Sequence, residues 1–270
     1  MLEVRVITAF LMLLVLVPAM LWLPQAGWAI LMAAVTALGA WEWGALAAFS
    51  EGARKCYGAG LFILMVLLVM FFPALLQWPD AALRPALLWV YGLAALFWLV
   101  LVPFWIRRRW NCKGAIGIWP GLMVLLPAWL AIVQFRALGV LPLLTVLSIA
   151  WVADSAAYFS GRAFGKHKLA PSISPGKTWE GVAGAVAGVL ILGFSIGPQA
   201  GVGALVWALI LMLLTAVSVL GDLFESLMKR LAGIKDSSQL LPGHGGILDR
   251  IDSLTAILPV SACCLLLIAA

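Results

Sequence analysis

Long apolar runs recur along the whole of this 270-residue chain, and they constrain its fold more than any other feature. Hydrophobic residues make up 65% of the chain and charged residues only 10%, a composition foreign to water-soluble domains. A run of about 20 apolar residues is the length that an α-helix needs to cross a bilayer, where the backbone must satisfy its own hydrogen bonds. We therefore expect an all-α fold, a multi-pass bundle of transmembrane helices that forms one integral-membrane domain.

The apolar runs predict nine spans. They cover residues 4–24, 28–49, 58–76, 86–105, 115–133, 138–160, 181–198, 203–227 and 253–269. If the N-terminus lies in the cytoplasm, 15 of the 17 Lys and Arg fall on the cytoplasmic side, and only Arg84 and Arg136 fall on the other. Positive charge concentrates in the cytoplasmic loops of membrane proteins. The sequence thus predicts a cytoplasmic N-terminus and, after an odd number of spans, an outside C-terminus.

The net charge of +6 does not indicate nucleic-acid binding, because the positive charge lies in short loops between spans. Arg107, Arg108 and Arg109 are expected to fix the topology and to contact anionic membrane lipids. The four cysteines show no metal-ligand spacing and predict no disulfide. Gly184 and Gly188, one helical turn apart, predict close packing against a neighbouring helix.

Acidic residues concentrate in the second half of the chain. From Asp154 onward it holds seven of its 11 acids and both of its histidines, whereas Glu42 is the acid within the cores of the first five spans. We interpret residues 1–137 as scaffold and residues 138–270, with two cytoplasmic loops, as the catalytic part. Glu42 has two open interpretations, as part of the same cavity or as a structural residue.

Asp154 lies within the sixth expected span. A carboxylate is costly inside a membrane and usually serves a function there. Ser148, Trp151, Ser155 and Tyr158 recur near it at helical spacing and predict one polar stripe. The alternative is a structural ion pair with an arginine of a neighbouring helix.

The loop that follows the sixth span is basic and rich in Gly, Pro and Ser. Its candidate substrate-binding residues are Lys166, Lys168, Ser174, Lys177, Thr178 and Glu180. Lysine and arginine beside flexible backbone suit phosphate binding. The Gly176-Lys177-Thr178 triplet resembles the end of a P-loop, but Pro171 stands where that motif needs its first glycine, so this is not a Walker A sequence.

The third candidate region begins at the end of the eighth span. Asp222, Glu225, Ser226 and Lys229 share one helical face, and a glycine-rich turn and two further aspartates follow at residues 242–252. Carboxylates suit Mg²⁺, which keeps waters or substrate phosphates in its coordination shell. Carboxylates, a glycine turn and interspersed basic groups are what metal-assisted chemistry on a phosphoanhydride requires.

These stretches carry a resemblance to a known family. The spaced residues run Ser226-x2-Lys229-Arg230-x4-Lys235-Asp236-x5-Pro242-Gly243-His244-Gly245-Gly246-x2-Asp249-Arg250-x-Asp252, and residues 174–181 and 154–165 add to the pattern. This pattern resembles the signature of the phosphatidate cytidylyltransferases, also called CDP-diacylglycerol synthases. The likeness in specific motifs covers residues 154–252, and the first five spans match in hydropathy.

The resemblance implies that CTP and phosphatidate react to CDP-diacylglycerol and pyrophosphate with Mg²⁺. It implies metal ligation by Asp222 and Asp249, a second, monovalent cation such as K⁺, and a homodimer. It also implies a bacterial-type inner membrane with the active site facing the cytoplasm. The expected catalytic residues are Asp222, Asp249, Lys229, Arg230 and His244. To the substrate-binding candidates of the basic loop it adds Asp154, Lys235, Asp236, Gly245, Gly246, Arg250 and Asp252.

Three other classes of membrane protein fit the sequence less well, and one of them, a structural or assembly protein, would not need the charged loop at residues 226–252. An ion-coupled transporter would place its acids near the bilayer midplane and would show similar halves, whereas here most acids lie at the cytoplasmic boundary and the halves differ. A CDP-alcohol phosphatidyltransferase would carry a D-G-x2-A-R sequence, which this chain lacks.

Overall fold

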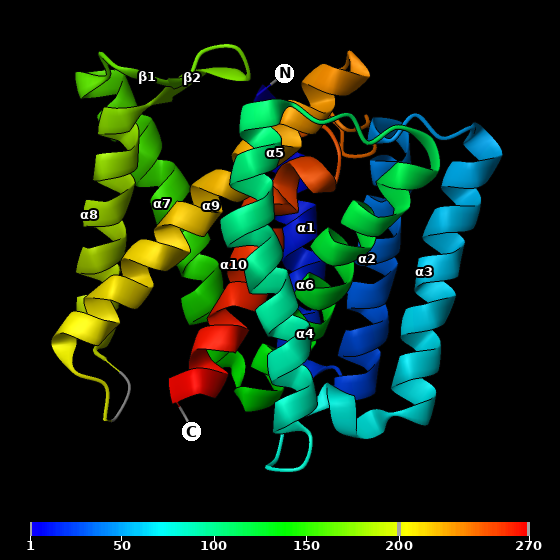
Figure 1. Ribbon diagram of the computed structural model, residues 1–270. Coiled ribbons are helices and arrows are strands. Elements are labelled where there is room, and N and C mark those ends of the chain that lie inside the picture. The colour runs from blue at the N-terminus through cyan, green and yellow to red at the C-terminus, as the bar shows by residue number, and fades with distance from the viewer. Residues whose placement is uncertain (1, 199–200, 269–270) are drawn as a thin grey trace.

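The computed structural model describes residues 2–198 and 201–268, with side chains from residue 6 onward. The chain forms a bundle of long, roughly parallel helices (Figure 1). The helices are α1 Leu2–Trp22, α2 Gln25–Leu46, α3 Glu51–Phe71, α4 Arg84–Leu96, α5 Val102–Arg108, α6 Ile118–Leu138, α7 Val140–Phe164, α8 Trp179–Ile196, α9 Ala204–Ala232 and α10 Leu248–Ile268. A π-helical segment, Phe97–Leu101, joins α4 to α5.

Eight helical segments of the described chain are long and apolar enough to cross a membrane, with α4 and α5 counted as one. The expected first span coincides with α1, whose described apolar stretch, Val6–Trp22, is shorter. The prediction of a helical, polytopic membrane protein is therefore confirmed. The count of nine spans and the orientation of the two termini remain predictions.

The structure adds a small sheet that the prediction of an all-α fold did not include. Strands β1 Lys168–Ala170 and β2 Ser174–Thr178 pair antiparallel, with Lys168 opposite Thr178 and Ala170 opposite Ser174. The Thr178 hydroxyl accepts a hydrogen bond from the Gly181 backbone at 3.1 Å and so caps the start of α8. The strand therefore passes directly into a helix, and β2 is held at the end of the bundle.

One end of the bundle carries the hairpin and the loops 109–117, 165–178 and 233–247, and we call it the hairpin end (Figure 1). The two basic residues predicted for the opposite side do lie at the opposite end, where each donates hydrogen bonds to backbone carbonyl groups of other segments. Arg136 donates to the carbonyl oxygens of Met20 and Leu23 at 3.1 and 2.6 Å, and Arg84 donates to that of Leu266 at 2.8 Å. Arg84 and Arg136, the two exceptions to the positive-charge bias, thus both have a structural role.

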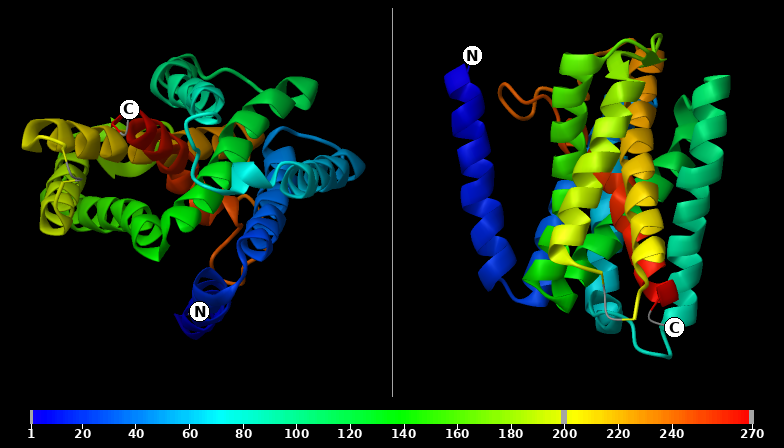
Figure 2. Two further views of the ribbon diagram at one scale, coloured as in Figure 1. Left: turned by 90° about the horizontal axis from the view of Figure 1, so that it is seen from below. Right: turned by 90° about the vertical axis from the view of Figure 1, so that its left-hand side faces the viewer.

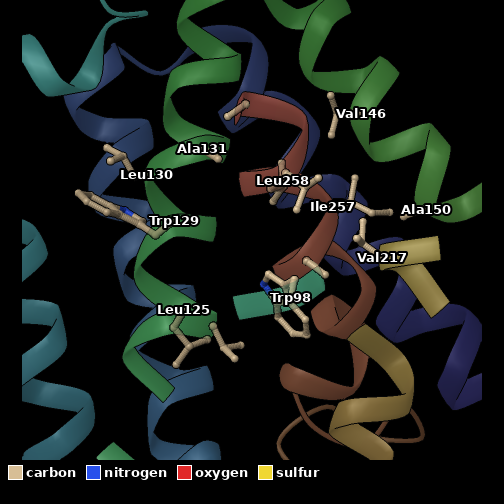
Figure 3. Packing of buried hydrophobic residues seen from close by; sticks show 14 of the residues in the cluster. Trp98, Leu125, Trp129, Leu130, Ala131, Val146, Ala150, Val217, Ile257 and Leu258 are labelled. Atoms are coloured by element: carbon tan, nitrogen blue, oxygen red, sulfur yellow. The ribbon is translucent and has the colours of Figure 1, made fainter. Parts of the chain in front are cut away.

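Helix α10 forms the centre of the bundle and contacts α2, α4, α6, α7 and α9. Figure 3 shows Ile257 and Leu258 of α10 among buried side chains of the surrounding helices. Gly221 of α9 lets the backbone of α10 come close, because a Cβ at this position would lie 2.6 Å from the Asp252 carbonyl oxygen. The helix that begins with Asp249 and Asp252 is therefore fixed by packing on nearly every side.

The close packing predicted at Gly184 and Gly188 is confirmed between α8 and α7. A Cβ at Gly184 would meet the Ser160 hydroxyl, and one at Gly188 would lie 2.9 Å from the Ala156 Cβ. Helix α1, by contrast, lies at the periphery of the bundle in both views of Figure 2. Its Thr8 hydroxyl donates to the Pro242 carbonyl oxygen at 3.0 Å, so α1 reaches the loop 233–247.

Candidate active site

A cleft of about 730 Å³ opens at the hairpin end between α7, β2, α9 and the start of α10. It brings together residues from all three candidate stretches of the sequence. The predicted residues that line it are Asp154, Ser174, Lys177, Thr178, Asp222, Lys229, Arg230, Lys235, Asp236, Asp249, Arg250 and Asp252. The fold thus assembles one site from segments that lie far apart in the chain.

The cleft lining combines charged and apolar surface. Aspartates, lysines and arginines contribute its polar surface, while Ala153, Ala157, Val182 and Val219 of α7, α8 and α9 contribute apolar surface. Such a lining can contact a polyanion and a hydrocarbon chain at the same time. A soluble nucleotide alone would not require the apolar part.

Lys177 and Asp222 form an ion pair across the cleft. The Lys177 Nζ lies 2.5 Å from the Asp222 Oδ2, and both side chains are about a quarter exposed, at 23% and 30%. The Ser226 hydroxyl, one turn further along α9, contacts the Asp222 Oδ1 at 3.3 Å. The pair joins the hairpin to α9, and its partial exposure leaves the ammonium accessible to an anion in the cleft.

Lys229 binds two carboxylates at once. Its Nζ lies 2.5 Å from the Glu225 Oε2 and 2.6 Å from the Asp249 Oδ1, and both carboxylates are only 6% exposed. Glu225 and Lys229 are four residues apart on α9, so helical spacing brings them together, whereas Asp249 comes from α10. This three-residue cluster fixes the end of α9 against the beginning of α10.

The loop before α10 wraps around Asp249. The Asp249 Oδ2 accepts hydrogen bonds from the Ser237 backbone at 2.9 Å, the Ser237 hydroxyl at 2.9 Å and the Gly246 backbone at 2.8 Å. Gly245 adopts a φ of +82°, and a Cβ there would lie 2.8 Å from the same carboxylate oxygen. Glycine is needed at this position for both reasons.

Six of the predicted site residues do not line the cleft within the described chain. They are Lys166, Lys168, Glu180, His244, Gly245 and Gly246. The two lysines are exposed on the hairpin and the segment before it. Gly245 and Gly246 lie behind Asp249 and shape the loop. A direct role of these six residues in the reaction remains a prediction.

Glu180 and His244 make local hydrogen-bond contacts outside the cleft lining. The Glu180 Oε1 lies 2.6 Å from the His167 Nδ1, and both carboxylate oxygens accept from the His167 backbone at 3.2 Å, which closes the base of the hairpin. The His244 backbone donates to the Leu241 carbonyl oxygen at 2.9 Å within the glycine turn. The His244 Nδ1 is buried and has no hydrogen-bond partner among the described residues.

Arg162, Tyr158 and Glu225 are not among the predicted catalytic or substrate-binding residues, although Tyr158 belongs to the predicted polar stripe of Asp154 and Glu225 to the predicted helical face of Asp222. Arg162 and Tyr158 line the cleft, and the Arg162 Nη1 lies 3.2 Å from the Tyr158 hydroxyl. Both could have been predicted from the sequence, because Tyr158 and Arg162 follow Asp154 in steps of four residues and so share its face of α7. Glu225 is buried behind the cleft, and its spacing of four residues from Lys229 indicates the ion pair between them.

Glu42 does not line the cleft in the described structure, and its side chain is completely buried on α2. The interpretation of Glu42 as a cavity-lining residue is therefore wrong. Its alternative, a structural role, agrees with four hydrogen bonds to the loop 233–247 and the start of α10.

The acidic side chains of the cleft fit a divalent cation in part. No group of three or more His, Cys, Asp or Glu in the described chain could by itself hold a metal ion. Mg²⁺, however, commonly takes one or two carboxylates together with waters and substrate phosphates. Asp222 fits this role, because its present partners, Lys177 and Ser226, are side chains that can turn away. Asp249 fits if Lys229 withdraws from its Oδ1.

Comparison with known proteins defines the class of this site. The family model described as "Cytidylyltransferase family" matches residues 3–268, and the chain belongs to this family. The phosphatidate cytidylyltransferase of Pseudomonas aeruginosa is 45% identical over 275 residues, which cover 97% of this chain and 96% of that protein. That of Haemophilus influenzae is 38% identical with 96% of each chain covered, and that of Brucella suis is 36% identical with 94% and 90% covered. The chain is accordingly an enzyme of the nucleotidyltransferase class.

Proposed function

We propose that this enzyme transfers the CMP moiety of CTP to phosphatidate, giving CDP-diacylglycerol and pyrophosphate, on the cytoplasmic face of a bacterial inner membrane. The relatives named phosphatidate cytidylyltransferase support this function. The observation that carries the proposal is the cleft itself, where basic side chains, carboxylates and an apolar wall meet at one end of a membrane bundle. These are the contacts that a nucleoside triphosphate and a phospholipid need together.

The proposed chemistry is a displacement at phosphorus. An oxygen of the phosphatidate phosphate attacks the α-phosphorus of CTP, and the bond from that phosphorus to the bridging oxygen breaks as pyrophosphate leaves. A phosphate monoester has a second pKa of about 6, so the attacking oxygen is already ionised at neutral pH. The reaction therefore needs no strong protein base. It needs positive charge that reduces the repulsion between two anions.

Three basic residues are placed to supply this charge. Lys177 of β2 and Lys229 of α9 both line the cleft, the first paired with one carboxylate and the second with two. Arg230 also lines the cleft, and its Nε donates to the Ile173 carbonyl oxygen at 3.2 Å, which orients the guanidinium. We propose that these side chains bind phosphates of CTP and phosphatidate. Lys235 and Arg250 add positive charge to the same lining.

Asp222 and Asp249 are the proposed Mg²⁺ ligands. A bound Mg²⁺ would neutralise phosphate oxygens and stabilise the leaving pyrophosphate. When the Lys177 ammonium turns to a substrate phosphate, Asp222 loses its cationic partner and can bind Mg²⁺ instead. Substrate binding and metal binding would therefore support each other at Asp222. Asp154 and Asp252 supply further oxygens to the lining, where a monovalent cation such as K⁺ is a second proposed ion.

The proposed orientation follows from the same arrangement. CTP is cytosolic, so the hairpin end would face the cytoplasm, and phosphatidate would enter sideways from the inner leaflet along the apolar wall. A homodimer is proposed on the resemblance to the family. Its mass in detergent, measured by light scattering with the detergent contribution subtracted, tests the assembly.

The function is tested with purified protein in detergent micelles, labelled CTP, phosphatidate and MgCl₂. We expect a lipid-extractable cytidine label that requires phosphatidate, disappears with EDTA and returns with excess Mg²⁺. Label that forms without phosphatidate, or not at all with folded protein and several phosphatidates, would contradict the proposal. Omitting phosphatidate while supplying a polyprenyl phosphate controls for another lipid acceptor.

A further inference from the structure

Glu42 links α2 to both ends of the loop that precedes α10. Its Oε1 accepts from the Ser238 hydroxyl at 2.6 Å and the Ile247 backbone at 2.9 Å. Its Oε2 accepts from the Ser237 hydroxyl at 3.1 Å and the Leu248 backbone at 2.7 Å. One carboxylate of a distant helix thus holds together residues from the beginning and the end of the loop.

The burial of Glu42 makes these contacts important. Its side chain is 0% exposed, and a buried carboxylate is costly unless hydrogen-bond donors surround it. The donors here are two backbone N–H groups, the Ser238 hydroxyl and the Ser237 hydroxyl, whose single proton is shared with Asp249, so each oxygen accepts at least one backbone hydrogen bond. No cation lies within ion-pair distance of this carboxylate in the described structure, and neutral loop groups meet its hydrogen-bonding requirement.

Ser237 connects Glu42 to the proposed metal ligand. Its hydroxyl lies 3.1 Å from the Glu42 Oε2 and 2.9 Å from the Asp249 Oδ2, and its backbone N–H donates to the same Asp249 oxygen. Gly246, which also donates to Asp249, has no room for a side chain, because a Cβ there would lie 2.6 Å from the Glu42 Oε1. The donors that orient Asp249 are therefore themselves packed against Glu42.

We infer that Glu42 is a positioning residue for the transfer reaction, which acts by holding Ser237 and Gly246 where they orient the Asp249 carboxylate. This inference rests on the proposed function, in which Asp249 binds Mg²⁺. Glu42 does not touch the cleft, so its effect passes through the loop. Partners behind a metal ligand set its orientation, and their loss typically costs about 10- to 100-fold in metal affinity or activity.

The test is the variant Glu42→Gln, assayed for CMP transfer with Mg²⁺ varied. An amide has the size of the carboxylate, but whichever way it turns, its NH₂ group faces a backbone N–H, of Ile247 or of Leu248. We expect kcat about 10- to 100-fold lower and a higher Mg²⁺ concentration at half-maximal rate. A merely structural role would reduce the fraction of active protein and leave that Mg²⁺ concentration unchanged.

Gln134→Leu is the matched control. Gln134 is as buried as Glu42, accepts from the Tyr91 hydroxyl at 2.7 Å and donates to the Leu75 carbonyl oxygen at 2.9 Å, away from the hairpin end. Its loss should lower thermal stability without changing the Mg²⁺ dependence of folded enzyme. The same shift in Mg²⁺ dependence in Gln134→Leu and Glu42→Gln would overturn the inference.

Ser237→Ala keeps the test decisive if Glu42→Gln does not fold. It removes the hydroxyl shared by the two carboxylates and leaves the contacts of Glu42 with Ser238, Ile247 and Leu248 intact. We expect its Mg²⁺ requirement to rise in the same direction, and the effects of the two substitutions not to add in the double variant. Unchanged Mg²⁺ dependence in Ser237→Ala, or in folded Glu42→Gln, overturns the inference. An inactive wild-type enzyme instead contradicts the proposed function.

Discussion

The Lys177 ammonium lies 2.5 Å from the Asp222 carboxylate, and this contact joins the hairpin to α9 across the cleft. Lys177 belongs to a basic loop and Asp222 to an acidic helix end, two stretches that the sequence presents as separate candidate sites. Their pairing makes them two sides of one site. When an anion binds, Lys177 can exchange Asp222 for it, and when a cation binds, Asp222 can exchange Lys177 for it.

Lys177→Met should lower kcat/KM for CTP by about 10- to 100-fold, because a hydrogen bond to a charged group is worth about 1.5–3 kcal/mol. The measurement is initial rate against CTP concentration at saturating phosphatidate. Lys55→Met is the control, since Lys55 is exposed, pairs with Glu51 at 3.4 Å on α3 and does not line the cleft of the described structure. Equal losses in the two variants would contradict a specific role for Lys177.

Asp222→Asn should reduce turnover by at least about 100-fold while the protein stays folded, because a metal ion supplies several kcal/mol of charge stabilisation. Folding is checked by size-exclusion chromatography and thermal melting in detergent. Asp80→Asn serves as the control, because the Asp80 Oδ1 accepts from the Ala82 and Leu83 backbones at 3.0 Å far from the cleft. Full Mg²⁺-dependent activity in Asp222→Asn would remove Asp222 from the metal site.

Cys112 should resist alkylation in the folded enzyme. It lies in the loop between α5 and α6, and burial raises the pKa of its thiol above the ordinary value, so less reactive thiolate is present at a given pH. Its Sγ also contacts the Met228 sulfur at 3.3 Å. Cys56 is exposed and provides the comparison within the same chain.

The experiment treats the enzyme with a maleimide at increasing pH and assigns each modified cysteine by mass spectrometry. We expect Cys56 to react first and Cys112 to react only at higher pH or after unfolding in SDS. Labelling of Cys112 as fast as that of Cys56 would show that the loop 109–117 is open in solution.

Gly184→Ala should destabilise the packing of α8 on α7. The new Cβ would meet the Ser160 hydroxyl and lie 3.2 Å from the Ala156 carbonyl oxygen, and overpacking of this kind costs about 1–3 kcal/mol. We expect a lower thermal midpoint in detergent. Gly60→Ala, at a helical position with nothing within 4 Å of the added Cβ, should leave the midpoint unchanged or slightly raised. A similar midpoint for the two variants would argue against close packing at Gly184.

Much of the bundle could be predicted from the sequence, since each expected span coincides with a helical segment of the structure. The hairpin could not, because its strands, Lys168–Ala170 and Ser174–Thr178, are only three and five residues long and the second contains Pro175 and Gly176, which are typical of turns. Of the predicted site residues, those that line the cleft come mostly from helix faces whose spacing is regular. Glu180 and His244 carry the same residue types but are directed into local hydrogen bonds.

The class of fold and the stretches that carry chemistry can be predicted from the sequence, because hydrophobic length and charged-residue spacing are local properties of the chain. Which charges meet, by contrast, depends on how the helices pack. Lys177 pairs with Asp222, Lys229 bridges Glu225 and Asp249, and Glu42 is directed away from the cleft into the loop before α10. The physical reason is that the partner of a buried charge depends on which helices pack together, and apolar helices of similar composition do not reveal their neighbours.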